Sequence, residues 1–133
     1  MNRIAMVGVA AVLVAGIAHA QGFRPTTVVR TLPGWKCMAL SSSYGAQGAY
    51  APPVPVYAGP EPSAPKIGTG AGVIIVPEKL RPTNGRTEMI RPNGQKAWID
   101  VNQLTAWHSL SDPAAVCHPA VLSNGRYGFT TSG

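Results

Sequence analysis

The chain has 133 residues, with eleven Lys and Arg against five Asp and Glu, which gives a net charge of +6 at neutral pH. That length favours a single domain. The basic residues are scattered and form no run or basic helix face, which argues against a nucleic-acid-binding protein.

The first 20 residues have the pattern of a secretory signal peptide. Arg3 supplies a positive start, residues 4–17 are uncharged and apolar, and residues 18–20 (Ala-His-Ala) form a small-x-small cleavage site. We expect cleavage before Gln21 and a net charge of +5 afterwards, because only Arg3 is removed. The apolar run is shorter than the roughly 20 residues that span a bilayer, so a retained anchor is the less favoured alternative. The sequence therefore predicts a periplasmic or secreted protein with no membrane insertion after cleavage.

Export bears on the two cysteines, Cys37 and Cys117. An oxidising compartment favours a disulfide between them, which would tie the start of the mature chain to its end. The alternative is a thiol nucleophile or a metal ligand, because His118 adjoins Cys117. We favour the disulfide, since no further ligands cluster around this pair.

Helix signals are nearly missing after the signal peptide. Thirteen prolines and fifteen glycines interrupt the chain, and no long window keeps an apolar period of 3.6 residues. The pattern predicts an all-β protein of short strands, at residues 35–40, 54–57, 72–76, 86–91, 96–99 and 127–130. The Ser-, Gly- and Ala-rich stretch 41–53 is typical of a mobile loop or linker.

Three Asn-Gly pairs mark turns. The clearest is Asn93-Gly94, because it lies between two strand-like runs, where a type I′ turn with positive φ at both residues predicts a hairpin. Asn84-Gly85 and Asn124-Gly125 mark further turns of the same chemistry.

The order of motifs from residue 54 to residue 107 resembles a bacterial SH3-like (SH3b) domain. The resemblance rests on 56–60 (Val-Tyr-Ala-Gly-Pro), the Pro-Ser turn in 62–68, the apolar strand 73–76, and 92–99 (Pro-Asn-Gly-Gln-Lys-Ala-Trp-Ile) followed by Leu104. It implies a small SH3-like barrel, with disulfide-linked N- and C-terminal flanking segments beside it. The expected organisation is a signal peptide at 1–20, an N-terminal flank and loop at 21–53, the barrel at 54–107 and a C-terminal flank at 108–133. The chain departs from the family pattern at Arg86, where an aromatic is common, and at Ala97.

No residue pattern indicates catalysis. The five acids lie on separate turns and strands without the paired spacing of a glycosidase, and each is better interpreted as solvated surface. His108, Asp112, Cys117 and His118 match no standard metal-ligand spacing. We therefore predict a protein that is not an enzyme and that needs no cofactor and no metal.

Aromatic side chains are the candidates for ligand binding. We expect Tyr57 to line a shallow groove with Trp98 or Trp107, where flat rings would take proline or sugar faces and Arg86 would add charge. The alternative is structural, with Trp98 in the core and Trp107 over the barrel end.

Two functions remain open. The resemblance implies an exported binding module whose partner is a cell-wall polymer such as peptidoglycan, or a peptide. The alternative is a structural or accessory envelope protein that binds a partner protein and no small ligand. Burial of Tyr57, Trp98 and Trp107 together would argue against the first function.

Overall fold

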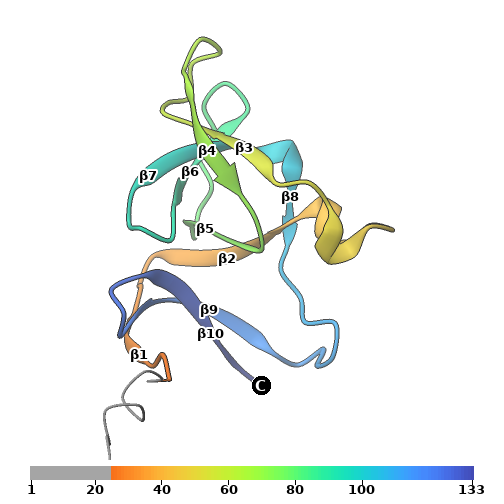
Figure 1. Cartoon of the computed structure of the whole chain (residues 1–133), viewed down its shortest axis with the longest axis vertical. Helices are drawn as coiled ribbons and strands as arrows, with labels where there is room; N and C mark the ends of the chain where they lie inside the picture. The colour runs from red at the N-terminus through yellow and green to blue at the C-terminus, as the bar shows by residue number, and fades with distance from the viewer. Residues whose placement is uncertain (1–24) are drawn as a thin grey trace, which may run out of the picture.

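The computed structural model describes residues 25–133, so the predicted signal peptide at 1–20 lies outside the described residues. This part of the chain is all-β, as predicted, and its strands form two antiparallel sheets (Figure 1). No helix in this range is long and apolar enough to cross a membrane.

The larger sheet has seven strands in the order β4-β3-β7-β6-β5-β2-β8. Its strands are β2 (Trp35–Leu40), β3 (Val54–Tyr57), β4 (Lys66–Gly70), β5 (Val73–Pro77), β6 (Arg86–Ile90), β7 (Lys96–Asp100) and β8 (Leu104–Ala106). The smaller sheet has the order β1-β9-β10 and consists of β1 (Val28–Thr31), β9 (Val116–Leu122) and β10 (Tyr127–Ser132). Three short 3-10 turns complete the elements: η2 (Ser41–Tyr44), η3 (Gly48–Tyr50) and η4 (Val101–Gln103).

Alternating side chains build the core of the larger sheet. On β7, Ala97 and Ile99 are fully buried, whereas Trp98 between them points to the opposite face and stays partly exposed. The same alternation on β3 buries Val54 and Val56. The main cluster of buried side chains comprises Leu40, Val54, Val56, Ile74, Val76, Met89, Ala97 and Ile99.

The closed barrel that the resemblance implied is not observed, because neither sheet closes and β4 and β8 remain separate edges. The predicted boundary at residue 54 also does not separate the larger sheet from its N-terminal flank. β2 lies between β5 and β8, with Cys37 opposite Ile75 and Leu40 opposite Leu104. The reason is apolar content: Leu40 belongs to the buried core of the larger sheet and Met38 packs against that core.

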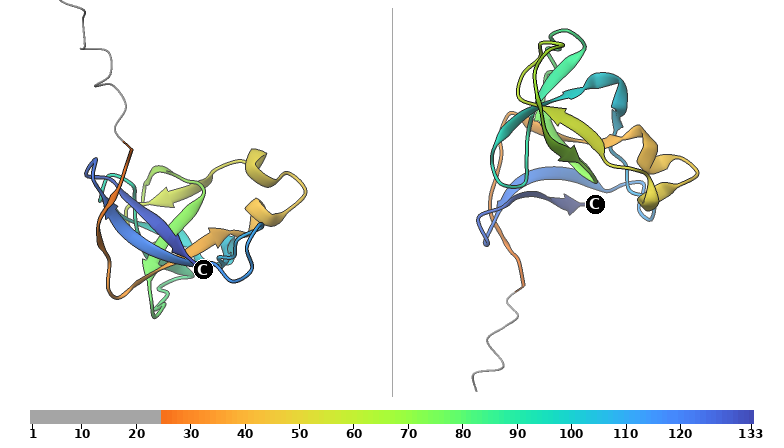
Figure 2. Two further views of the ribbon diagram at one scale, coloured as in Figure 1. Left: turned by 90° about the horizontal axis from the view of Figure 1, so that it is seen from below. Right: turned by 45° about the horizontal axis from the view of Figure 1, so that its top comes forward.

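The predicted disulfide is confirmed. Cys37 and Cys117 are bonded, with a Cα–Cα distance of 5.9 Å and a sequence separation of 80 residues. Because Cys37 lies on β2 and Cys117 on β9, the bond joins the two sheets. The smaller sheet packs along β2, as Figures 1 and 2 show.

The three Asn-Gly turns are present, and the predicted type I′ pattern is confirmed at Asn84-Gly85 but not at Asn93-Gly94 or Asn124-Gly125, where only the glycine has positive φ. The type I′ pattern occurs at Asn84-Gly85, where both residues have positive φ, 51° and 76°, and Thr83 and Arg86 exchange two backbone hydrogen bonds. At the predicted hairpin only Gly94 has positive φ, and its amide donates to the carbonyl of Arg91. That arrangement is a three-residue loop with a glycine bulge, favoured because Pro92 fixes the second turn position in negative φ.

Candidate binding surfaces

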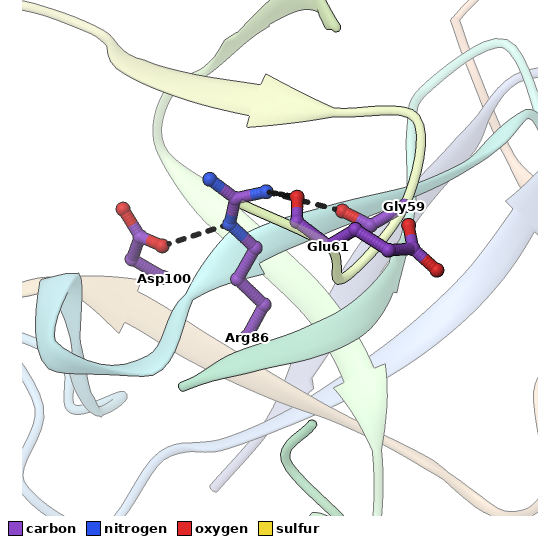
Figure 3. Close-up of polar contacts among 4 residues, drawn as sticks. All are labelled: Gly59, Glu61, Arg86 and Asp100. Carbon is purple, nitrogen blue, oxygen red and sulfur yellow. Dashed lines mark hydrogen bonds and ion pairs between the residues drawn. The ribbon is translucent and has the colours of Figure 1, made fainter. Parts of the chain in front are cut away.

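Arg86, one of the predicted ligand-binding residues, is occupied by the protein itself. Its residue is only 9% exposed. Nε donates to Oδ1 of Asp100 at 3.1 Å, and Nη1 donates to the backbone carbonyls of Gly59 at 3.2 Å and Glu61 at 2.8 Å (Figure 3). The guanidinium carbon lies 3.6 Å from the ring centre of Tyr57. A buried cation with these partners fixes the loop after β3, so Arg86 is a structural residue and not a free ligand contact.

Two of the predicted aromatic residues are neighbours on the outer face of the larger sheet. Tyr57 of β3 pairs directly with Trp98 of β7, and Trp98 also lies opposite Glu88 of β6. Directly paired residues of antiparallel strands project from the same face, so Tyr57, Trp98 and Glu88 share one surface. Trp107 lies beyond β8 and is also partly exposed. None of the three aromatic residues is buried, so Trp98 is not a core residue. The burial of all three that would have argued against a binding module is not observed.

A cleft with mixed charge opens beside Trp98. We call it the Trp98 cleft; its volume is about 460 Å³, and it is lined by Gly34, Pro77, Glu78, Lys79, Arg81, Thr87, Glu88 and Trp98. Glu88 is already paired with Lys96, at 3.0 Å between Oε1 and Nζ. In the described part of the chain, Lys79 and Arg81 belong to no ion pair, and both are exposed. The cleft therefore combines a flat aromatic face with two cations that a ligand can reach.

Trp107 belongs to a different hollow, between the two sheets. We call it the Trp107 groove; its volume is about 420 Å³, and it is lined by Ala39, Ser43, Tyr44, Gly72, Val73, Trp107, His108, Ser109, Leu110 and Phe129. No Asp, Glu, Lys or Arg lines it. Leu110 is 83% exposed and Phe129 is 45% exposed, so this is an open apolar surface. Exposed apolar patches of this kind mark interaction sites.

One wall of the Trp107 groove is fixed by Tyr44. The Tyr44 hydroxyl donates to the carbonyl of His108 at 2.8 Å and accepts from the amide of the same residue at 2.9 Å. The two rings are stacked, with centroids 3.9 Å apart. Tyr44 lies in the stretch 41–53 that we predicted as a mobile loop, and these contacts attach its η2 turn to the segment after β8.

The structure thus brings Tyr57, Arg86 and Trp98 together and places Trp107 elsewhere. Of the two pairings that we predicted for Tyr57, with Trp98 or with Trp107, the structure forms the one with Trp98. Sequence reasoning also missed Lys79, Arg81, Leu110 and Phe129. Scattered cations and a lone leucine in a loop give no pattern, because only the tertiary fold places them beside a tryptophan.

The candidate metal ligands of the sequence analysis do not come together in the described part of the chain. Among residues 25–133, no three His, Cys, Asp or Glu side chains lie close enough to hold a metal ion. Cys117 is in the disulfide, and His118 Nε2 forms a hydrogen bond with the hydroxyl of Ser132 at 2.8 Å. The two hollows offer chemistry for binding: aromatic faces, cations and an apolar groove.

Comparison of the chain with protein-family models, with curated proteins and with solved structures found no match.

Proposed function

We propose that this protein is an exported, non-enzymatic binding module that recognises peptidoglycan through the Trp98 cleft. The observation that carries the proposal is the partly exposed indole of Trp98 beside Lys79 and Arg81, two cations without ion pairs among the described residues. The SH3b-like order of motifs supports the same class of function.

The chemistry of the cell wall matches these groups. A peptidoglycan strand presents the flat faces of sugar rings, and its peptides carry free carboxylates. An indole face stacks on apolar ring surfaces, and Lys or Arg pairs with carboxylates. The net charge of the mature chain, +5 once Arg3 is removed with the signal peptide, adds long-range attraction to an anionic polymer.

The location in the proposal is outside the cytoplasm. The signal-peptide pattern at 1–20 and the Cys37–Cys117 disulfide both support export, because disulfides persist in oxidising compartments. The bond also ties the smaller sheet to β2. A disulfide of this kind stabilises a small domain whose core alone buries little apolar surface.

The alternative, an accessory envelope protein that binds a partner protein, has an observation of its own. The Trp107 groove is apolar, exposed and lined by residues of both sheets: Ala39 from β2, Val73 from β5 and Phe129 from β10. This surface is separate from the Trp98 cleft, so one chain can carry both functions.

The test is cosedimentation of mature protein, residues 21–133, with purified peptidoglycan. Trp98→Ala removes the stacking face, and we expect it to weaken retention by about tenfold. Trp98→Leu, which keeps an apolar side chain on the sheet, should weaken retention as well. Replacement of Lys79 and Arg81 by Gln should lower retention and reduce its sensitivity to salt.

Trp107→Ala is the matched control, because it removes the same type of side chain from the other hollow. It should sediment like the wild type. Equal losses for Trp98→Ala and Trp107→Ala, or no sedimentation of the folded wild type, would contradict the proposal. Circular dichroism of each variant confirms that the fold is retained.

A further inference from the structure

We propose that the outer edge of β10 and the Trp107 groove together bind an extended, uncharged segment of a partner protein, which adds to the smaller sheet as a fourth strand. This inference is independent of wall binding and deepens the partner-binding alternative, on which it rests. Phe129 links the two features, because it lies on the edge strand and also lines the groove.

The edge of β10 presents backbone groups that can pair with another strand. β10 pairs with β9 on one side only. The amide of Tyr127 points away from β9 and donates to the carbonyl of Pro92 at 2.8 Å. Because backbone groups alternate along an antiparallel strand, Phe129 and Thr131 point outward in the same way. In the described part of the chain, neither of their amides has a partner outside the strand.

β10 also lacks the features that protect the other edges. The outer strand β1 contains Arg30, β4 contains Lys66, and β8 has only three residues. β10 has six residues, Tyr-Gly-Phe-Thr-Thr-Ser, with no charge and no proline. The hairpin covers the edge at Tyr127, whose outward amide is bonded to Pro92, and the part from Gly128 to Ser132 is left unprotected. Proteins blunt exposed edges with charges, prolines or short strands, so this part of the edge indicates a surface for another chain.

The groove decides what kind of segment fits. Its lining contains no Asp, Glu, Lys or Arg, so a charged side chain would lose water without gaining an ion pair. The exposed side chains of Leu110 and Phe129 gain from contact with apolar residues. An extended segment with alternating apolar and uncharged polar residues satisfies both the groove and the edge.

Charge and shape favour a partner segment over a second copy of this chain. Two copies of the mature protein, with ten Lys and Arg against five Asp and Glu once Arg3 is removed, would each bring a net charge of +5 to the contact, which opposes association. In addition, β10 of a second copy arrives with β9 attached, so it is wider than a single extended strand.

The probe is a short, acetylated and amidated peptide of alternating threonine and valine, titrated into isotope-labelled mature protein by NMR. We expect saturable binding, shifts confined to the groove and β10, and slower hydrogen exchange of the Phe129 and Thr131 amides. A matching peptide with lysine in place of valine should bind at least about tenfold more weakly.

Two variants separate the edge from the groove. Thr131→Pro deletes an outward amide and leaves the bonds to β9, so it should weaken binding by about tenfold. Leu110→Asp, at a site that is 83% exposed, should do the same without unfolding the protein. Val29→Asp is the matched control, because Val29 is a 65% exposed apolar residue on β1, the opposite edge of the same sheet.

Three outcomes would overturn the inference. One is no binding of the threonine-valine peptide, and another is binding that Thr131→Pro and Leu110→Asp leave unchanged. The third is a concentration-dependent dimer in sedimentation that Thr131→Pro abolishes, because a second copy would then occupy the edge. The Trp98→Ala variant should bind this peptide normally, so failure here leaves the wall-binding proposal to its own test.

Discussion

Arg86 follows the Asn84-Gly85 turn, at a position where the SH3b pattern commonly has an aromatic residue. In the fold its guanidinium covers the ring of Tyr57 and donates hydrogen bonds to two backbone carbonyls and to the carboxylate of Asp100. A cation at this position therefore replaces apolar packing with hydrogen bonds. No rule of sequence pattern predicts that exchange, because the carbonyl acceptors belong to a loop 25 or more residues away in the chain.

Arg86→Met should destabilise the protein. The substitution leaves Asp100 and two carbonyls without their donor, and we expect a loss of about 2 to 3 kcal/mol in the free energy of unfolding. Urea denaturation measures this. Arg30→Met, at an exposed arginine of β1, is the control and should change stability by less than about 0.5 kcal/mol. Equal effects for the two variants would show that the Arg86 contacts contribute nothing.

The tyrosine Tyr44 is a second case in which local sequence is misleading. Its surroundings are Ser, Gly and Ala, which indicate a loop, and the chain does form only short 3-10 turns there. What the pattern omits is the double hydrogen bond between its hydroxyl and the backbone of His108. A contact across 64 residues depends on the tertiary fold, so residue-level prediction identified the aromatic candidates but not their roles.

At the level of elements, the strands with alternating apolar residues were predictable. β2 and β3 have the predicted ends, and β5, β6, β7 and β10 differ from their predicted ranges by only a few residues. Four strands were missed: β1, β4, β8 and β9. β4 contains two glycines, β9 contains Pro119, and β8 has three residues, so pairing with neighbours and not propensity makes these three strands. β1 has a favourable sequence, Val-Val-Arg-Thr, but it is short and exposed along its whole length.

The glycine turns allow a comparison of two similar positions. Gly85 and Gly94 both have positive φ, 76° and 84°, but an added Cβ meets nothing within 4 Å at Gly85 and meets the Tyr127 ring at 2.9 Å at Gly94. Gly85→Ala should cost only the strain of left-handed backbone, about 1 kcal/mol. Gly94→Ala should cost at least about 1 kcal/mol more, because the ring must move.

Thermal unfolding of the two glycine variants measures this difference. Gly94→Ala should also weaken the contact between the hairpin and β10, because the Tyr127 amide there donates a hydrogen bond to the carbonyl of Pro92. If Gly85→Ala proves the more damaging substitution, the packing of Tyr127 on this turn is not as described.

For the whole molecule, the disulfide holds two sheets that share the Trp107 groove. The signal-peptide pattern and the two cysteines were enough to predict the bond, but the sequence alone could not show that β2 belongs to the larger sheet. That placement requires β5 and β8 as neighbours on either side, and both are distant in sequence. The Trp98 cleft could not be predicted for the same reason, since its lining residues are brought together by the fold. They come from the turn before β2, from the end of β5 and the loop after it, and from β6 and β7.

Removal of the disulfide should loosen the smaller sheet first. Closing a loop of 80 residues stabilises the folded state by up to about 4.5 kcal/mol in the chain-entropy model. A variant with both Cys37→Ala and Cys117→Ala should therefore unfold at lower urea concentration. Hydrogen exchange should rise more in β9 and β10 than in β6 and β7. Uniform acceleration across both sheets would contradict the assignment of the bond to the contact between them.

Binding of the cell wall in the Trp98 cleft, as proposed, can be followed through the indole signals of the three tryptophans. Trp35, Trp98 and Trp107 each give one indole N–H resonance, and a soluble peptidoglycan fragment can be titrated against all three by NMR. We expect a saturable shift of the Trp98 signal, while the Trp107 signal stays in place. A shift of Trp107 without Trp98, or no shift of any indole, would contradict the proposal.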